Sequence, residues 1–151
     1  MLGRKDYTPE ELAQARSAVE QQLAVYRQLV EAVDSSPPSP ELTAALEALE
    51  PLFFNNMAIV LDRYFVHRIR TVTGKDGNPL NEVELISDSL MYNDGIFRGN
   101  NVIKLIPQQS IAKLEIGDRI RLRAAQFEQL SRAFLDEIDA RFVEGAPRSG
   151  G

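Results

Sequence analysis

The sequence predicts an all-α protein, or one nearly so: a single-domain helical bundle of about four helices. Three places pair a helix-capping residue with a proline that fits the first helical position, namely Thr8-Pro9, Ser39-Pro40 and Asn78-Pro79. Between them, apolar residues recur at spacings of three and four, the period of an amphipathic helix. A chain of 151 residues fits one domain with its own core. We expect that domain over residues 1–143, followed by a flexible C-terminal tail at 144–151.

The first helix is expected at about residues 8–33. Glu11 completes a capping box with Thr8, because its side chain can reach back to the backbone N–H of the cap residue. The apolar stripe behind this start consists of Leu12, Ala15, Val19, Leu23, Tyr26, Val30 and Val33. Three prolines at positions 37, 38 and 40 end the helix, since proline removes a backbone donor and clashes with the preceding turn.

The second helix is expected at about 40–73, and it carries two apolar stripes. The first stripe contains Leu42, Leu46, Leu49, Phe53, Met57, Val60 and Tyr64. The second stripe contains Phe54, Ala58, Leu61, Phe65, Ile69 and Val72. Two neighbouring stripes are typical of a central bundle helix that is buried on most of its circumference. Because the pattern continues past Pro51, we expect one bent helix, ended by the glycines of GKDGN at 74–78.

The remaining helices are expected at about 79–92 and 124–142. Asn78 caps the third helix, and the NDG run that follows Tyr92 breaks it. The inward residues of the last helix are Phe127, Leu130, Phe134, Leu135, Ile138 and Phe142. The segment near residues 102–122 leaves two alternatives open. Its β-branched residues and Gly-Asp turn favour a small β-hairpin, whereas an irregular packed connection accommodates the same residues.

Composition narrows the classes of function. A net charge of −5 argues against a nucleic-acid partner, because nucleic-acid-binding domains present a basic surface. The absence of cysteine excludes disulfides, thiol chemistry and thiolate metal sites. The N-terminus has no apolar leader, and no apolar run reaches about 18 residues, the length of a membrane span. We therefore expect a cytoplasmic protein with no membrane partner.

The strongest candidate site is a polar line on the second helix. On a continuous helix Arg63 and Arg70 lie about 20° apart and His67 lies about 40° from Arg63. The most apolar residues point the opposite way: Phe54, Leu61, Phe65 and Val72. Two guanidiniums and an imidazole suit a small anionic ligand, and Glu82 on the next helix joins the proposed set. The alternative is that these arginines pair with acidic residues of the third helix, for instance Glu82, Glu84 or Asp88.

Evidence for catalysis is weaker, and whether the protein is an enzyme stays open. Nucleophile motifs such as GxSxG are absent, and the GKDGNP turn at 74–79 lacks the spacing of a phosphate-binding loop. A metal site is not expected, because the chain holds one histidine and Asp62 lies about 140° around the helix from it. No cofactor is expected either.

Two stretches, FVHRIRTVTGKDGNPLNEVELISDSL and KLEIGDRIRL with the later FEQLSRAF, resemble an uncharacterised family of small bacterial proteins of unknown function. The resemblance covers about residues 52–142. It implies a bacterial cytoplasmic setting and carries no fold, activity or ligand with it.

Three functions from different classes follow from these patterns. The leading hypothesis is a non-enzymatic structural or protein-interaction module that self-associates as a homodimer, because two stripes on one helix need more cover than three other helices supply. The alternative is a small anionic-ligand-binding protein or enzyme that uses Arg63, His67 and Arg70 with Glu82. The third, a nucleic-acid-associated regulator, rests on a basic strip formed by Arg119, Arg121 and Arg123.

Overall fold

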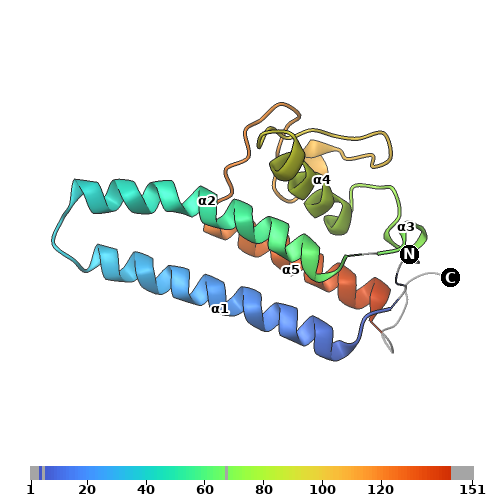
Figure 1. The fold of residues 1–151 in the computed structure, drawn as a ribbon, viewed down its shortest axis with the longest axis horizontal. Coiled ribbons are helices and arrows are strands. Elements are labelled where there is room, and N and C mark those ends of the chain that lie inside the picture. The colour runs from blue at the N-terminus through green and yellow to red at the C-terminus, as the bar shows by residue number, and fades with distance from the viewer. Residues whose placement is uncertain (1–3, 5, 67, 144–151) are drawn as a thin grey trace.

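A computed structural model describes residues 4, 6–66 and 68–143, and the helices in this part of the chain confirm the all-α prediction (Figure 1). They are α1 (Pro9–Asp34), α2 (Pro40–Tyr64), α3 (Arg70–Thr73), α4 (Pro79–Tyr92) and α5 (Ala124–Phe142), with a single 3-10 turn, η1, at Pro107–Gln109. The described residues form no β-strand. The predicted tail at 144–151 lies outside them.

The helices pack around α2, which contacts α1, α4 and α5. Figure 1 shows α1 and α2 as a long antiparallel hairpin, with α5 alongside both helices and α4 on another side of α2. The closed end of the hairpin projects beyond the N-terminus of α5. This projecting end is the part of the bundle with the least cover.

The predicted helix starts are confirmed by their caps. Thr8 accepts a hydrogen bond from the backbone N–H of Glu11, and Ser39 and Asn78 accept the equivalent bonds at the starts of α2 and α4. The start of α5 is capped differently. The carboxylate of Glu50 on α2 accepts from the backbone N–H of Ala124 at 3.1 Å and from Arg123 Nη1 at 2.7 Å.

The second helix is shorter than predicted, because α2 ends at Tyr64 and not near residue 73. The guanidinium of Arg68 turns back and donates to the carbonyl oxygens of Asp62 and Phe65, the groups that a continuing helix would have paired internally. Arg70 begins the separate short helix α3. Pro51 lies inside a continuous α2, as expected.

Aromatic side chains fill the core along the length of the bundle. Phe54, Phe65, Phe134 and Phe142 are all at most 1 % exposed. Tyr7 ties the chain before α1 to this core: its ring lies 5.0 Å from that of Phe65, and its hydroxyl donates to the carbonyl of Val66.

The connection from α4 to α5 is irregular, so the predicted hairpin near 102–122 does not form in the described residues. One isolated antiparallel bridge joins Ile96 to Arg119. The Asn55 side chain of α2 makes the hydrogen bonds that a neighbouring strand would make. It donates to the carbonyl of Ile120 at 2.8 Å and accepts from the N–H of Leu122 at 3.0 Å. Ile120 and Leu122 are buried, so the in-and-out alternation persists without a sheet.

Candidate functional site

The end of α2 separates the members of the predicted polar line. Arg63 lies on α2 with an exposed side chain, whereas Arg70 begins α3 after the break. His67 lies outside the described residues. The angular argument that placed these residues on one helix face is therefore wrong, because the backbone between Arg63 and Arg70 is not one helix.

Arg70 is fully engaged with its own protein. Its Nη1 donates to the side-chain oxygen of Asn81 at 2.7 Å and to the carbonyl of Gly74 at 3.1 Å, and its Nη2 pairs with Glu84 at 2.7 Å. The alternative raised from the sequence, pairing with the acidic third helix, is confirmed for this arginine. Its guanidinium holds the 70–74 turn against α4.

Glu82 is buried and holds a loop in place. Its two carboxylate oxygens accept from the backbone N–H groups of Ile111 and Ala112 at 2.9 and 2.8 Å. Burial raises the pKa of this carboxyl, and the two backbone hydrogen bonds oppose the increase. A carboxylate committed to loop amides has a structural role, so Glu82 does not join Arg63 or Arg70 in a ligand set.

The residue that the sequence did not single out in this region is Arg68. Its side chain is 7 % exposed, pairs with Asp62 at 2.8 Å, and lies over the ring of Phe134. Its Nε–H is buried and has no hydrogen-bond partner among the described residues. Arg68 and Arg70 line a cavity of about 150 Å³ with Asp62 and Glu84. Within the described residues, one buried donor beside this cavity therefore has no acceptor.

Charges around this cavity balance. The two arginines face the two carboxylates with which they form ion pairs. The pKa of nearby Asp88 is raised, chiefly by burial and then by the negative charges of Glu84 and Asp62, while Arg63 lowers it. An anion that enters would meet carboxylates as well as guanidiniums, which weakens its net attraction.

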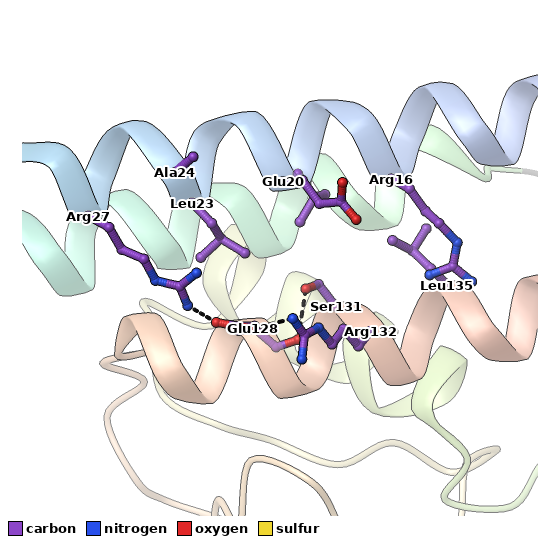
Figure 2. Close-up of a pocket in the computed structure, with 10 residues that line it drawn as sticks. Arg16, Glu20, Leu23, Ala24, Arg27, Glu128, Ser131, Arg132 and Leu135 are labelled. Carbon is purple, nitrogen blue, oxygen red and sulfur yellow. Dashed lines mark hydrogen bonds and ion pairs between the residues drawn. The ribbon is translucent and has the colours of Figure 1, made fainter.

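A second polar groove lies between α1 and α5, and its cavity is about 130 Å³ (Figure 2). In Figure 2 Arg27 of α1 and Arg132 of α5 point toward the same carboxylate, that of Glu128. Arg16 pairs with Asp136 at 2.8 Å. The Arg27–Glu128 and Arg16–Asp136 pairs join the two helices, whereas the Arg132–Glu128 pair lies within α5. Across the described part of the chain, no three His, Asp or Glu side chains come together as a metal site would require.

The two apolar stripes of α2 differ in how deeply they are buried. The stripe of Phe54, Ala58, Leu61 and Phe65 is at most 1 % exposed. The other stripe is covered only in part: Leu42, Leu49, Val60 and Tyr64 are each 38–42 % exposed, whereas Leu46 and Phe53 are half-buried and Met57 is buried. Leu52, beside this second stripe, is 70 % exposed.

The adjoining side of α1 is uncharged from Gln14 to Ala32. At 100° per residue, eight uncharged residues fall within an arc of about 120°. They are Gln14, Ala18, Gln21, Gln22, Val25, Gln28, Leu29 and Ala32. The charged residues from Arg16 to Asp34 fall in a separate arc of about 60°. They are Arg16, Glu20, Arg27, Glu31 and Asp34.

The uncharged sides of α1 and α2 form one surface. Val25 and Leu29 of α1 line a groove of about 350 Å³ together with Leu49 and Phe53 of α2. We call this surface the hairpin face: the eight uncharged α1 residues above, together with Leu42, Ala45, Leu49, Leu52, Phe53, Asn56 and Val60 of α2. A helical wheel of α1 alone would have revealed its half of the face.

By length and composition α2 is apolar enough to cross a membrane, a criterion that core helices of soluble proteins also meet. Only 22 % of its most apolar stretch is buried within this chain. Asn55 and Asp62 nevertheless tie α2 into the fold through the Ile120–Leu122 backbone and Arg68. The helix is a component of the bundle with one side left uncovered.

No family model, curated protein or solved structure matched this chain. The resemblance to small uncharacterised bacterial proteins therefore stays a prediction. What the protein does is best inferred from the geometry of its surfaces.

Proposed function

We propose that this protein is a non-enzymatic structural or protein-interaction module that self-associates, and that the hairpin face is its contact surface. The single observation that carries the proposal is the contrast between the two stripes of α2. One stripe has the burial of a core, whereas four of the seven members of the other, Leu42, Leu49, Val60 and Tyr64, remain exposed.

The energetic reason is the apolar area left in water. Burying apolar surface contributes roughly 25 cal/mol per Å², and large exposed apolar patches on soluble proteins mark contact sites. Val25, Leu29, Leu49 and Leu52 are each 40–70 % exposed, so the other helices of the chain leave them largely in water. A partner that covers them gains this free energy without rearranging the core.

Sedimentation velocity over a range of micromolar concentrations tests the proposal. We expect wild type to reach twice the chain mass of 16.9 kDa, and Leu52→Glu to sediment as a monomer with an unchanged helical circular dichroism spectrum. The matched control is Ile116→Glu, since Ile116 is 53 % exposed but lies in the loop between α4 and α5. A wild type that stays monomeric would remove the proposal.

A second candidate function, binding of a small anion, is supported by Arg68. Its Nε–H is buried without a described acceptor and lies beside the cavity at the α2–α3 corner. A carboxylate or phosphate oxygen would supply the missing acceptor. The arginine side-chain Nε–H resonance of Arg68 should shift on addition of acetate or inorganic phosphate and not on addition of chloride at equal ionic strength. If neither anion shifts this resonance, the anion-binding function is contradicted.

A further inference from the structure

We propose that a second copy of this chain covers the hairpin face in one specific arrangement. In this arrangement α2 crosses the partner's α2 in antiparallel orientation about a two-fold axis at Leu52, so that Glu41 meets the partner's Arg63. This inference rests on the proposed self-association and adds which residues meet. It is a prediction about geometry that oligomeric state alone does not test.

The hairpin face suits a copy of itself because it carries no charge. A patch that carries a net charge of either sign repels an identical patch. The polar positions of the face are the neutral amides Gln14, Gln21, Gln22, Gln28 and Asn56. In a two-fold interface the same patch meets itself, so neutral polar groups avoid the like-charge cost that acidic ones would incur.

Two opposite charges stand at the ends of the exposed sector of α2, and they are symmetric about Leu52. Glu41 lies eleven residues before Leu52 and Arg63 lies eleven residues after it. Eleven residues are close to three helical turns, so the three side chains lie within about 20° of each other per step. Antiparallel pairing about Leu52 therefore brings Glu41 opposite the partner's Arg63 at both ends of the interface.

Neither charge has an ion-pair partner within the described part of its own chain. Arg63 forms no hydrogen bond or ion pair there, in contrast to Arg68 and Arg70 on the other side of the corner. Glu41 accepts one long hydrogen bond, from Ser39 at 3.4 Å. Both side chains are exposed, so pairing across the interface requires no existing ion pair to break.

Between the two ends, residues at equal distances on either side of Leu52 differ in size, one being an alanine and the other larger. Ala45 and Ile59 are equidistant from Leu52, as are Ala48 and Asn56. Antiparallel pairing therefore sets an alanine of one helix against a larger residue of the other, which lets the helices approach closely. Leu52 meets its own copy at the axis.

The same rotation places α1 over the partner's α1, where both helices present glutamine, alanine and Val25. The other simple two-fold arrangement places α2 over the partner's α1. That arrangement also buries the face, but it leaves Glu41 without Arg63 opposite. The charge symmetry about Leu52 favours the first arrangement.

A lipid surface fits the face less well than a protein does. Helices that lie on membranes carry lysine and arginine on their polar side to meet anionic headgroups. Apart from Arg16 and Arg27, which pair with α5, the charged arc of α1 is acidic: Glu20, Glu31 and Asp34. Four glutamines within the face would also have to enter the apolar layer.

Cysteine cross-linking tests the arrangement directly, because the chain has no cysteine of its own. Leu52→Cys should form an intermolecular disulfide rapidly under mild oxidation, since two copies of residue 52 meet at the axis. The matched control Met91→Cys, at an exposed position on α4, should not cross-link above background. A mixture of Leu52→Cys and Val25→Cys separates the two arrangements, because preferential formation of the mixed disulfide would mean that α2 lies over the partner's α1.

Charge reversal supplies an independent readout that needs no disulfide. Glu41→Arg or Arg63→Glu alone should weaken dimerisation by about tenfold, because each places like charges together at both ends of the interface. The double variant Glu41→Arg with Arg63→Glu should restore the wild-type dissociation constant. Restoration is the signature of direct pairing, since two independent surface effects would add.

The outcomes separate this inference from the proposed function. A dimer that shows neither residue-52 cross-linking nor charge rescue overturns the arrangement and leaves self-association standing. A wild type that is monomeric in solution overturns both. A monomer that co-sediments with phosphatidylserine-containing vesicles would assign the face to a membrane and also overturn the arrangement.

Discussion

The polar corner at the end of α2 and the hairpin face along the exposed sides of α1 and α2 differ in how far the single chain satisfies their side chains. At the corner, Arg68 and Arg70 each have a carboxylate partner and several hydrogen bonds within the chain. On the hairpin face, Leu49 and Leu52 have the side chains of a core and remain in water. The polar groups of the corner are nearly all paired within the single chain, whereas the apolar side chains of the face remain exposed.

This difference distinguishes charged groups that stabilise the fold from apolar groups that are left for a partner to cover. A cluster of charged residues is often taken for a functional site. Where the charged groups pair with one another, however, they act mainly to position a backbone turn. Exposed apolar residues are less often taken for a site, although their contact with water costs free energy until a partner covers them. Five substitutions would break or sharpen this contrast, and they follow in order of expected effect.

The largest effect is expected from a matched pair of leucines on α2. Leu61→Ala empties a fully buried position and should cost about 3–5 kcal/mol of unfolding free energy. Leu52→Ala should change the stability of the monomer by less than about 0.5 kcal/mol while weakening self-association. Urea denaturation at a concentration where the protein is monomeric, followed by sedimentation, measures both quantities. Equal costs at the two positions would erase the distinction between the stripes.

The second effect concerns the buried carboxylate of Glu82. Glu82→Gln retains only one acceptor oxygen, so one of the N–H groups of Ile111 and Ala112 loses its partner at a cost of about 1–3 kcal/mol. Hydrogen exchange should accelerate at these two amides and not in α1. Unchanged exchange there would mean that Glu82 does not fix the loop.

The same variant predicts a pH dependence. Burial raises the pKa of Glu82 in the folded protein above its unfolded value, so the folded state favours the protonated form. The stability gained is present below the unfolded pKa and is lost as pH rises through the folded pKa. The difference in unfolding free energy between wild type and Glu82→Gln should therefore be larger near about pH 4 than at neutral pH. The reverse trend would contradict the burial-dominated shift.

A smaller effect is expected at the corner itself. Glu84→Gln removes the charge that pairs with Arg70 and should cost roughly 0.5–1 kcal/mol, because both side chains remain partly exposed. It should also lower the pKa of Asp88, since the negative charge of Glu84 is one of the causes that raise it. A carboxyl NMR titration of Asp88 measures this change, and Glu137→Gln on α5 serves as the control.

The smallest effect is expected in the groove between α1 and α5. Arg132 is exposed and shares Glu128 with Arg27, so Arg132→Ala should change stability by no more than about 0.5 kcal/mol. The change should shrink further in high salt, because exposed pairs are screened. Thermal denaturation at two salt concentrations checks both statements.

The helix starts were predictable because their signals are local. Thr8-Pro9, Ser39-Pro40 and Asn78-Pro79 encode each start within a few residues, and the predicted 79–92 and 124–142 helices coincide with α4 and α5. The end of α2 was not predictable in this way. The stripe that contains Ile69 and Val72 keeps its period, while Arg68 ends the helix through a tertiary position over Phe134 that no local pattern encodes.

The candidate site was predicted in part. The two stripes on α2 predicted a surface that needs a partner, and the exposed members of one stripe are Leu42, Leu49, Val60 and Tyr64. The polar line was wrong because it assumed a continuous helix. Glu50 capping α5 and Asn55 holding the Ile120–Leu122 backbone were also missed, since each joins residues more than sixty positions apart.

The most direct test of the central claim, that another copy of the chain covers the hairpin face, is a dilution series followed by methyl NMR. The methyl resonances of Val25, Leu29, Leu49 and Leu52 should move between two limiting positions as concentration rises, in step with the measured mass. Those of Leu61 and Ile138, which are fully buried in the single chain, should stay fixed. Association that moves the methyls of Val102, Ile106 or Ile116 and leaves the hairpin face unchanged would contradict the account.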